Sequence, residues 1–319
     1  MTDSSQPKQP VDAHRILVIK LGALGDFIQA FGPFQAIRQA YPEARICLLT
    51  TPPFENLAQR SGWFDTVLLD SRPRLTDIAA VLDLRHRLMR ERFDLVVDLQ
   101  TSGRSSAYRK LIWPQTPLWS GIAKEASHRH ENPRRDTMHT IDRQAEQLAM
   151  IGIEPPKRVS MDWLTGGPPV VEGLSDRFAL LLPGGAPHRP EKRWPATRYA
   201  GLAQSLSKTG VQPVVLGTAT EAEEAEIIQA SCPQALNLIG RTSLPDIAAL
   251  AGQADLAVGN DTGPMHLASV CGCPSVVIFS HASDPALCGQ RGPHVAILRN
   301  EEIAAISVQQ VVEAAEGLG

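Results

Sequence analysis

Short, uninterrupted apolar runs alternate with helix-length segments along this chain, in two series. The runs are residues 15–20, 46–50, 67–70 and 94–99 in the first series, and 178–182, 213–216, 235–239, 255–258 and 275–279 in the second. Runs of this kind are typical of strands buried on both faces of a sheet. Strands that alternate with helices predict parallel sheets. The sequence therefore predicts an α/β protein with two parallel sheets.

A stretch without clear periodicity separates the two series. It is bracketed by prolines and glycines at 153–156 and 166–169, which is typical of a domain boundary. We predict a Rossmann-like domain over residues 15–165 and a second over residues 170–319, whose last helix is a candidate to pack back on the first domain. Residues 1–14 are predicted to be a disordered lead-in.

Composition excludes several classes of protein. The net charge of −3 over 319 residues argues against a general nucleic-acid binder. Five scattered cysteines without a C-x-x-C pair predict a reduced, cytoplasmic compartment and no metal site. No apolar run reaches membrane-spanning length, so any membrane contact is expected to be peripheral.

The stretch Val258–Ala268 combines the end of a buried strand, a polar turn and a helix start. Thr262 or Gly263 suits the cap and Pro264 the first helical position. Free backbone N–H groups at such a turn form a site for a phosphate or diphosphate. An ordinary capped turn between strand and helix is the alternative.

A glycine loop, Leu21–Asp26, follows the first apolar run and precedes a helix predicted over 27–40. Its G-x-x-G spacing differs from the G-x-G-x-x-G of dinucleotide enzymes, which disfavours a nicotinamide oxidoreductase. Asp26 has two interpretations. It is either a helix N-cap, which the local sequence favours, or a general base that takes a proton from an attacking hydroxyl.

Further charged residues follow the strands of the second series. Lys192 and Arg193 suit an anionic ligand, although they are equally compatible with a solvated pair. Glu221 is placed either to accept hydrogen bonds from a ribose or to cap the acidic helix that follows it. His266, one turn into its helix, faces either a ligand or the core.

Several basic residues gather between Arg104 and Arg143. They form either a solvated surface or a face for an anionic partner such as a phosphorylated lipid headgroup. His139 and Arg143 lie four residues apart at a helix predicted over 140–151, and hence on one side of it.

Three motifs together resemble those of the glycosyltransferase family that contains the lipopolysaccharide heptosyltransferases. They are Lys20–Asp26, Pro183–Gly185 with Lys192–Pro195, and Asn260–Ala268. The resemblance implies the two-domain GT-B fold with an active site in the cleft, an ADP-sugar donor on the C-terminal domain, and an anionic glycolipid acceptor on the N-terminal domain. It also implies an inverting transfer without metal or other cofactor, at the cytoplasmic face of the inner membrane.

The resemblance also assigns roles to individual residues. Asp26 matches the catalytic aspartate. The donor side is matched by Lys192 with its neighbour Arg193, by Glu221, and by Asp261, Thr262, Gly263 and His266. His139 and Arg143 resemble an acceptor-side pair, to which we add Arg104. One departure is visible, because the family often has proline six residues after the aspartate, where this chain has Gly32 and then Pro33.

Two other functions remain open at this stage. A nucleotide-sugar epimerase shares the fold and the donor type, and it would release an epimerised sugar without any acceptor. A non-catalytic nucleotide-sugar binding protein would bind the donor without turnover.

Overall fold

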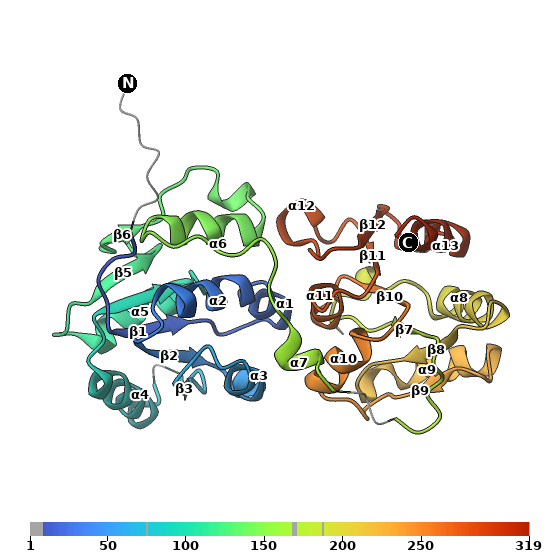
Figure 1. The fold of residues 1–319 in the computed structure, drawn as a ribbon, viewed down its shortest axis with the longest axis horizontal. Helices are drawn as coiled ribbons and strands as arrows, with labels where there is room; N and C mark the ends of the chain where they lie inside the picture. The colour runs from blue at the N-terminus through green and yellow to red at the C-terminus, as the bar shows by residue number, and fades with distance from the viewer. Residues whose placement is uncertain (1–8, 75, 168–170, 187, 319) are drawn as a thin grey trace. The chain divides into compact units, whose positions relative to one another are not determined.

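The computed structural model describes residues 9–74, 76–167, 171–186 and 188–318. The chain divides into two compact units, Met1–Val159 and Ser160–Gly319. Each unit is built on a six-stranded sheet in which every strand pairing is parallel, with helices packed against the sheet (Figure 1). The predicted α/β class with two parallel sheets is confirmed. No helix within the described ranges is long and apolar enough to cross a bilayer.

The N-terminal unit has the strand order β3-β2-β1-β4-β5-β6. Its strands are β1 (Arg15–Ile19), β2 (Arg45–Thr50), β3 (Thr66–Leu69), β4 (Leu95–Asp98), β5 (Leu118–Gly121) and β6 (His128–Arg129). Its helices are α1 (Leu24–Ile28), α2 (Phe31–Ala40), α3 (Glu55–Arg60), α4 (Ile78–Glu91), α5 (Gly103–Ile112) and α6 (Thr140–Ala149).

Alternate residues of each central strand enter two different cores, because successive side chains of a strand point to opposite faces. Leu17 and Ile19 of β1 join a buried cluster with α4 and α5. Ile16 and Val18 are equally buried on the other face. Burial on both faces explains why the strands appear in the sequence as continuous apolar runs.

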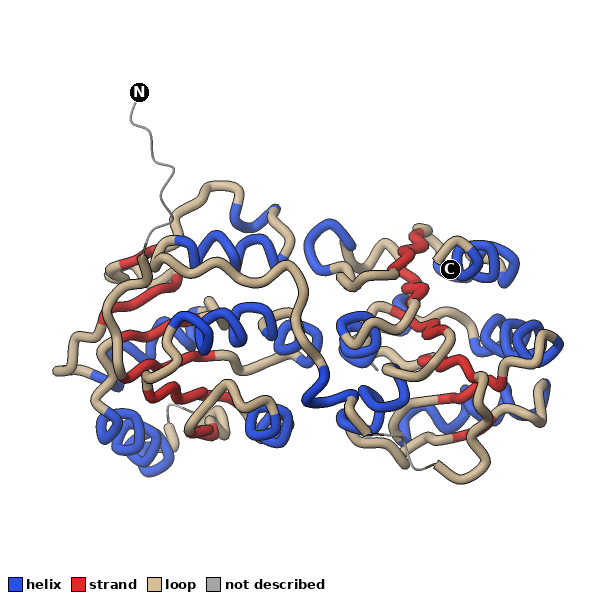
Figure 2. The backbone as a smooth tube through the Cα atoms, in the orientation of Figure 1, coloured by secondary structure: helices blue, strands red, loops and turns tan. Residues whose placement is uncertain are grey.

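The C-terminal unit has the strand order β12-β11-β10-β7-β8-β9. Its strands are β7 (Phe178–Leu182), β8 (Gln212–Val215), β9 (Leu236–Asn237), β10 (Leu256–Asn260), β11 (Ser275–Phe279) and β12 (Val295–Arg299). Its helices are α7 (Asp162–Thr165), α8 (Ala196–Lys208), α9 (Ala222–Ser231), α10 (Leu244–Ala251), α11 (Gly263–Val270), α12 (Pro285–Cys288) and α13 (Val308–Glu316). The closing helix α13 packs on α8 and beside β11 and β12 of its own unit (Figure 2).

Part of the expected N-terminal lead-in is attached to its unit. Residues 1–8 lie outside the described residues, whereas Val11 donates its N–H to the Ile151 carbonyl at 3.2 Å. The Tyr41 hydroxyl in turn donates to the Val11 carbonyl at 2.8 Å. These bonds hold the segment that leads into β1.

The helix predicted over 27–40 is two helices, α1 and α2, and the single-helix prediction is wrong. Pro33 explains the break, because in a continuous helix its missing N–H would have to donate to the Gln29 carbonyl. In α2, Pro33 lies within the first turn, where an absent N–H costs no intrahelical bond. Asp26 consequently lies on a short helix of five residues.

Candidate functional site

Asn260, at the carboxyl end of β10, connects the motifs of the C-terminal unit. Its side chain is fully buried. Its amide donates to the carbonyls of Pro183 and Gly184 at 2.8 and 2.9 Å. Its oxygen accepts from the Trp194 backbone N–H at 3.0 Å and the Tyr199 hydroxyl at 3.2 Å. One amide thereby brings three separate stretches of sequence to the same edge of the sheet.

Lys192 and Asp261 meet at this edge. Lys192 ends a short 3-10 helix, Pro190–Lys192, and its Nζ lies 2.7 Å from Asp261 Oδ2. The same carboxylate accepts from Ser283 Oγ at 2.8 Å and Gln290 Nε2 at 3.3 Å. Both members of the pair are mostly buried. The structure therefore places a paired lysine, with polar neighbours, at the end of the central strand.

The helix start that follows Asp261 leaves its first amides without a side-chain cap. Thr262 is the N-cap residue, one of the two positions expected, but its side chain makes no capping bond. Thr262 Oγ1 is buried and has no hydrogen-bond partner within the described part of the chain. Pro264 occupies the second helical position, not the first as predicted. The N-terminus of α11 thus offers the N–H groups of Thr262 and Gly263 as donors to an anion, whereas Pro264 has no N–H to donate.

Arg193 forms ion pairs with two glutamates. Its guanidinium lies 2.9 Å from Glu224 and 3.4 Å from Glu221, and it also donates to the Gly185 carbonyl at 2.6 Å. Lys192 and Arg193 are adjacent in sequence, yet their charges serve different partners. The structure therefore brings Lys192, not Arg193, to Asp261.

Glu221 closes a capping box on a short 3-10 helix, Ala219–Glu221. Its oxygens accept from the backbone N–H and hydroxyl of Thr218 at 2.9 and 2.8 Å, and from the Thr220 hydroxyl at 2.7 Å. Glu221 is also the N-cap residue of the acidic helix α9, as the capping interpretation placed it, but its side chain makes no capping bond to α9 and serves the 3-10 turn instead. A carboxylate has about four acceptor sites, so a ribose would have to replace one of these donors.

His266 lies on the first turn of α11 and is only 7% exposed. Its N–H donates to the Thr262 carbonyl at 3.3 Å, which fixes it within the helix. Gly259, on strand β10, is required by packing, because an added Cβ would lie 2.7 Å from the Met265 side chain. The start of α11 therefore crosses β10 closely.

In the N-terminal unit, the glycine loop is anchored by residues distant in sequence. The Leu21 N–H donates to Gln100 Oε1 at 2.8 Å, and the Leu21 carbonyl accepts from Thr51 Oγ1 at 3.1 Å and Arg72 at 2.7 Å. Gly22 has a φ of +112°, and a Cβ there would lie 2.7 Å from the Phe54 ring. Only glycine fits at this position.

Asp26 is not the N-cap of its helix, so the capping interpretation is wrong. The N-cap residue of α1 is Ala23, and Asp26 lies within the first turn without a capping role. The next residue, Phe27, is buried and stacks on Phe54 with ring centroids 4.6 Å apart. Packing of Phe27 therefore fixes α1. The half-buried Asp26 carboxylate does not cap this helix.

A buried charge cluster surrounds the carboxyl ends of β1 and β4. Lys20 is 4% exposed and donates to the Leu99 carbonyl at 3.1 Å. Burial lowers the pKa of Lys20 to about 8, attraction by Asp26 and Asp98 opposes this, and repulsion by Arg143 and Arg135 adds to it. The structure therefore brings Asp26 and Arg143 within electrostatic reach of one lysine.

Asp98 is the fully buried carboxylate of this cluster. Its Oδ1 accepts from the N–H groups of Gln100 and Thr101 at 3.1 and 2.9 Å, while Oδ2 has no hydrogen-bond partner among the described residues. Burial raises the pKa of Asp98 to about 6. Arg135 donates to Thr101 Oγ1 at 2.7 Å, and burial lowers its pKa.

The other two predicted acceptor residues have structural partners. Arg104 pairs with the buried Asp70 at 3.4 Å and donates to the Tyr108 hydroxyl at 2.9 Å. His139 is the N-cap of α6 and accepts the Ile141 N–H on Nδ1 at 3.2 Å. Arg143 is on the first turn of that helix. Of the three, Arg143 is the one that joins the Lys20 cluster.

Sequence reasoning missed Lys20, Asp98 and Asn260 as site residues. Each is the last residue of a buried strand or follows it directly. That position was the available signal, because open α/β sheets carry their chemistry at the carboxyl ends of the strands. Among the described residues, no group of three or more His, Cys, Asp or Glu side chains is arranged to hold a metal ion.

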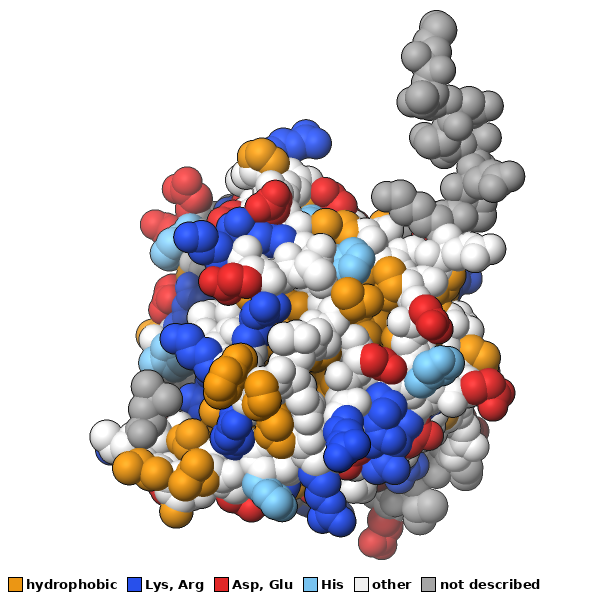
Figure 3. All heavy atoms as spheres, turned by 90° about the vertical axis from the view of Figure 1, so that its left-hand side faces the viewer, with side chains coloured by type: hydrophobic (Ala, Val, Ile, Leu, Met, Phe, Trp, Pro, Cys, Tyr) orange, Lys and Arg blue, Asp and Glu red, His pale blue; other side chains and the backbone are white. Residues whose placement is uncertain are grey.

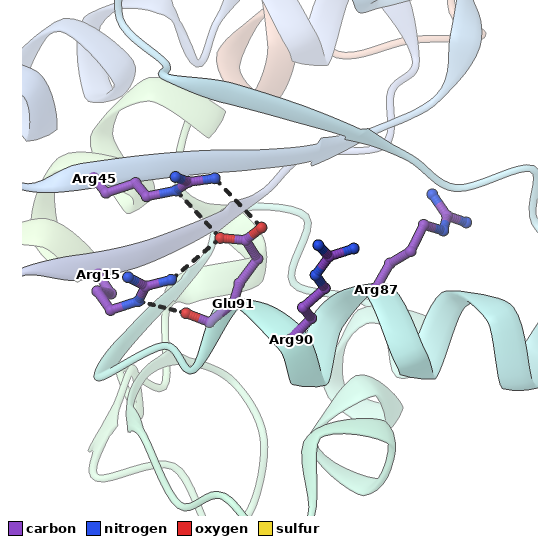
Figure 4. Close-up of a pocket in the computed structure, with 5 residues that line it drawn as sticks. All are labelled: Arg15, Arg45, Arg87, Arg90 and Glu91. Atoms are coloured by element: carbon purple, nitrogen blue, oxygen red, sulfur yellow. Dashed lines mark hydrogen bonds and ion pairs between the residues drawn. The ribbon is translucent and has the colours of Figure 1, made fainter.

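A basic hollow lies at the opposite edge of the N-terminal sheet. It is lined by Arg15, Arg45, Arg87, Arg90 and Glu91 (Figure 4). Arg15 and Arg45 begin their strands, and both pair with Glu91 at 3.4 and 3.2 Å. The hollow is therefore an ion-pair network at the amino ends of the strands, away from the motif loops of this sheet.

Comparisons with known proteins point to one family. Residues 81–315 match the model of glycosyltransferase family 9 (heptosyltransferase). The lipopolysaccharide core heptosyltransferase OpsX of Haemophilus influenzae is 25% identical over 83% of this chain and 79% of its own. Lipopolysaccharide heptosyltransferase 2 of Escherichia coli K12 is 26% identical over 84% of this chain and 83% of its own.

The fold agrees with solved structures as well. The structure titled E. coli heptosyltransferase WaaC with ADP superposes with a TM-score of 0.80 at 20% identity, covering 96% of this chain and 100% of that one. The GT-B fold predicted from the resemblance is thereby confirmed. Because the family model spans most of the sequence, the chain belongs to glycosyltransferase family 9, the heptosyltransferase family.

Proposed function

We propose that this protein transfers a heptose from ADP-heptose to an anionic lipopolysaccharide-core glycolipid, with inversion at the anomeric carbon and without a metal ion. The observation that carries the donor half is the Lys192–Asp261 pair beside the uncapped N-terminus of α11. The related heptosyltransferase structures that carry ADP and an ADP-heptose analogue support the choice of nucleotide. The proposed site of action is the cytoplasmic face of the inner membrane.

On the donor side, the amides of Thr262 and Gly263 at the start of α11 bind the diphosphate, assisted by the helix dipole. Lys192 stabilises the negative charge that grows on ADP as the glycosidic bond breaks. Asp261 is an acceptor-only group, so it suits hydroxyl groups of the donor. Glu221 takes a ribose hydroxyl in exchange for one of its present threonine donors, and His266 lines the base of the same turn.

On the acceptor side, the hydroxyl of the glycolipid attacks the anomeric carbon from the face opposite the leaving ADP. Asp26 removes the hydroxyl proton as the new bond forms, which is general-base catalysis. Arg143 and Arg135 bind anionic groups of the acceptor near Lys20. Arg104 and His139 act by holding their elements in place, because their side chains already have the partners described above.

The first experiment is calorimetric titration of the protein with ADP, UDP and GDP in the presence of EDTA. We expect ADP alone to bind tightly, and ADP-heptose to be consumed only when a lipopolysaccharide-core acceptor is supplied. Preference for UDP or GDP would overturn the heptose assignment while leaving the transferase proposal standing. Release of an altered sugar without acceptor would instead indicate an epimerase. Binding of no nucleotide would overturn the donor site.

A further inference from the structure

Large apolar side chains are exposed mainly in one part of the N-terminal unit. Among the described residues, Trp113 is 68% exposed, Ile78 67%, Leu82 56% and Leu118 37%. The fifth such residue, Ile297, is 37% exposed and lies on β12 of the C-terminal unit. Exposed apolar side chains that gather on one surface indicate an interaction site, whereas singly exposed ones do not.

Two of these four residues lie on α4, and the other two lie at either end of a loop that is bonded to α4. Ile78, Leu82 and Arg85 recur at i, i+4 and i+7 and so share one side of α4. Arg85 donates to the Trp113 carbonyl at 2.7 Å and to the Leu111 carbonyl at 2.5 Å. This bond seats the loop that contains Trp113 and leads to Leu118 on that side of the helix.

A second bond holds the same loop at the other end of α4. Gln115 Nε2 donates to the Met89 carbonyl at 2.8 Å. We call the surface formed by Ile78, Leu82, Trp113 and Leu118 the α4 face. On the side of the molecule that Figure 3 shows, apolar side chains lie among Lys and Arg side chains.

The segment of the chain that carries the α4 face has a positive net charge. Residues 72–118 contain nine Lys and Arg but five Asp and Glu, although the whole chain has a net charge of −3. Arg85 lies at the loop and donates to the Lys110 carbonyl at 3.4 Å, and the Lys110 side chain is exposed. Within the described residues, Arg85 makes no ion pair and bonds only neutral carbonyls.

The combination of apolar and basic side chains indicates which kind of partner binds the α4 face. A second copy of this face would bring like charges together, which disfavours symmetric self-association. An anionic bilayer complements the charge, and tryptophan is enriched at membrane–water interfaces. We propose that the α4 face docks this protein on a membrane surface that contains anionic phospholipid. Membrane binding itself is argued without the proposed function. Only its role, which is to bring the enzyme to a glycolipid acceptor, rests on the proposed function.

The test measures co-sedimentation of the full-length protein with vesicles that contain neither glycolipid nor nucleotide. Vesicles of phosphatidylcholine alone are compared with vesicles that also contain phosphatidylglycerol. We expect binding to the anionic vesicles, weakened by salt because exposed charges are screened. Trp113→Ala should reduce the partition coefficient about tenfold, since a buried indole side chain is lost. Lys110→Gln should reduce it about fivefold.

Ile297→Ser is the matched control, because it removes an exposed apolar side chain from the other unit. It should leave binding unchanged, and urea unfolding is used to establish that every variant is folded under the conditions of the binding assay. Equal binding to neutral and anionic vesicles, or wild-type binding by Trp113→Ala, would overturn the proposal. Self-association that Trp113→Ala abolishes would identify a second copy as the occupant and also overturn it. None of these outcomes depends on whether the protein transfers heptose.

Discussion

The buried Lys20 makes a prediction whose sign depends on pH. The substitution is Lys20→Met, which keeps an unbranched side chain of similar length and removes the charge. Burial lowers the pKa of Lys20 from its ordinary 10.5 to about 8. Because one pKa unit equals about 1.4 kcal/mol, this corresponds to a penalty of about 3 kcal/mol on the charged form in the folded state. Lys20→Met also removes the hydrogen bond to the Leu99 carbonyl, which lowers the stability of the variant by about 1 kcal/mol.

The penalty applies in full below pH 8, where Lys20 is protonated in both the folded and the unfolded state. Between pH 8 and 10.5 the folded protein releases the proton while the unfolded chain retains it. The unfolded state then binds more protons, so the stability of the wild type rises with pH. We therefore expect Lys20→Met to be more stable than wild type by about 2 kcal/mol near pH 7.5 and less stable by about 1 kcal/mol near pH 10.5.

The assay is urea unfolding of both proteins across this pH range. Groups such as Tyr41 and Cys47, whose pKa values burial raises to about 12, occur in both proteins and cancel in the difference. Lys110→Met, at an exposed lysine, is the control and should show no change with pH. A difference between Lys20→Met and wild type that is the same at both pH values would refute the reasoning, as would a less stable variant at pH 7.5.

Two further predictions concern the proposed transfer. Asp26→Asn should lower kcat by at least about 10² while leaving the Kd for ADP and, within about 1 kcal/mol, the stability unchanged, because Asp26 is not a cap. Asp77→Asn, at the N-cap of α4, is the control and should leave kcat unchanged. Equal turnover by the two variants would contradict the role of Asp26 as the general base. Lys192→Met should lower kcat by about 10²–10³ and weaken ADP binding. Because it also leaves Asp261 unpaired, the double variant with Asp261→Asn should recover stability but not kcat, and recovery of kcat would contradict a role for the lysine in transfer.

The strands could be predicted well because burial on both faces leaves a signal within five or six adjacent residues. The position of the N-cap of α1 could not be predicted, because it depends on the backbone of the preceding loop. That loop is held by Gln100, Thr51 and Arg72, which lie between 30 and 79 residues away in sequence. Nothing beside Asp26 indicates that Ala23, and not the aspartate, adopts the extended cap conformation.

For the charged residues of the candidate site, too, some features can be predicted from the local sequence and others depend on distant residues. Lys192 and Arg193 look alike in the sequence, and only the folded chain shows that Arg193 faces Glu221 and Glu224. Lys20 ends an apolar run, but the sequence does not show that Asp98 is buried near it. Position at a strand end predicts that a residue belongs to the site, whereas its charged partner is set by tertiary packing.

The pairing of Lys192 with Asp261 also bears on when the lysine contributes to the proposed reaction. In the structure the lysine charge is already balanced by a carboxylate at 2.7 Å, whereas the first amides of α11 have no side-chain cap. Ground-state binding of the diphosphate therefore gains most from these amides. As negative charge develops on the departing ADP, its attraction to Lys192 increases. The attraction between Lys192 and Asp261 stays the same, because the Asp261 charge does not change. An interaction that strengthens in this way lowers the barrier more than it tightens substrate binding. Lys192 is accordingly expected to influence kcat more than the Kd for ADP-heptose, in which this charge has not yet developed.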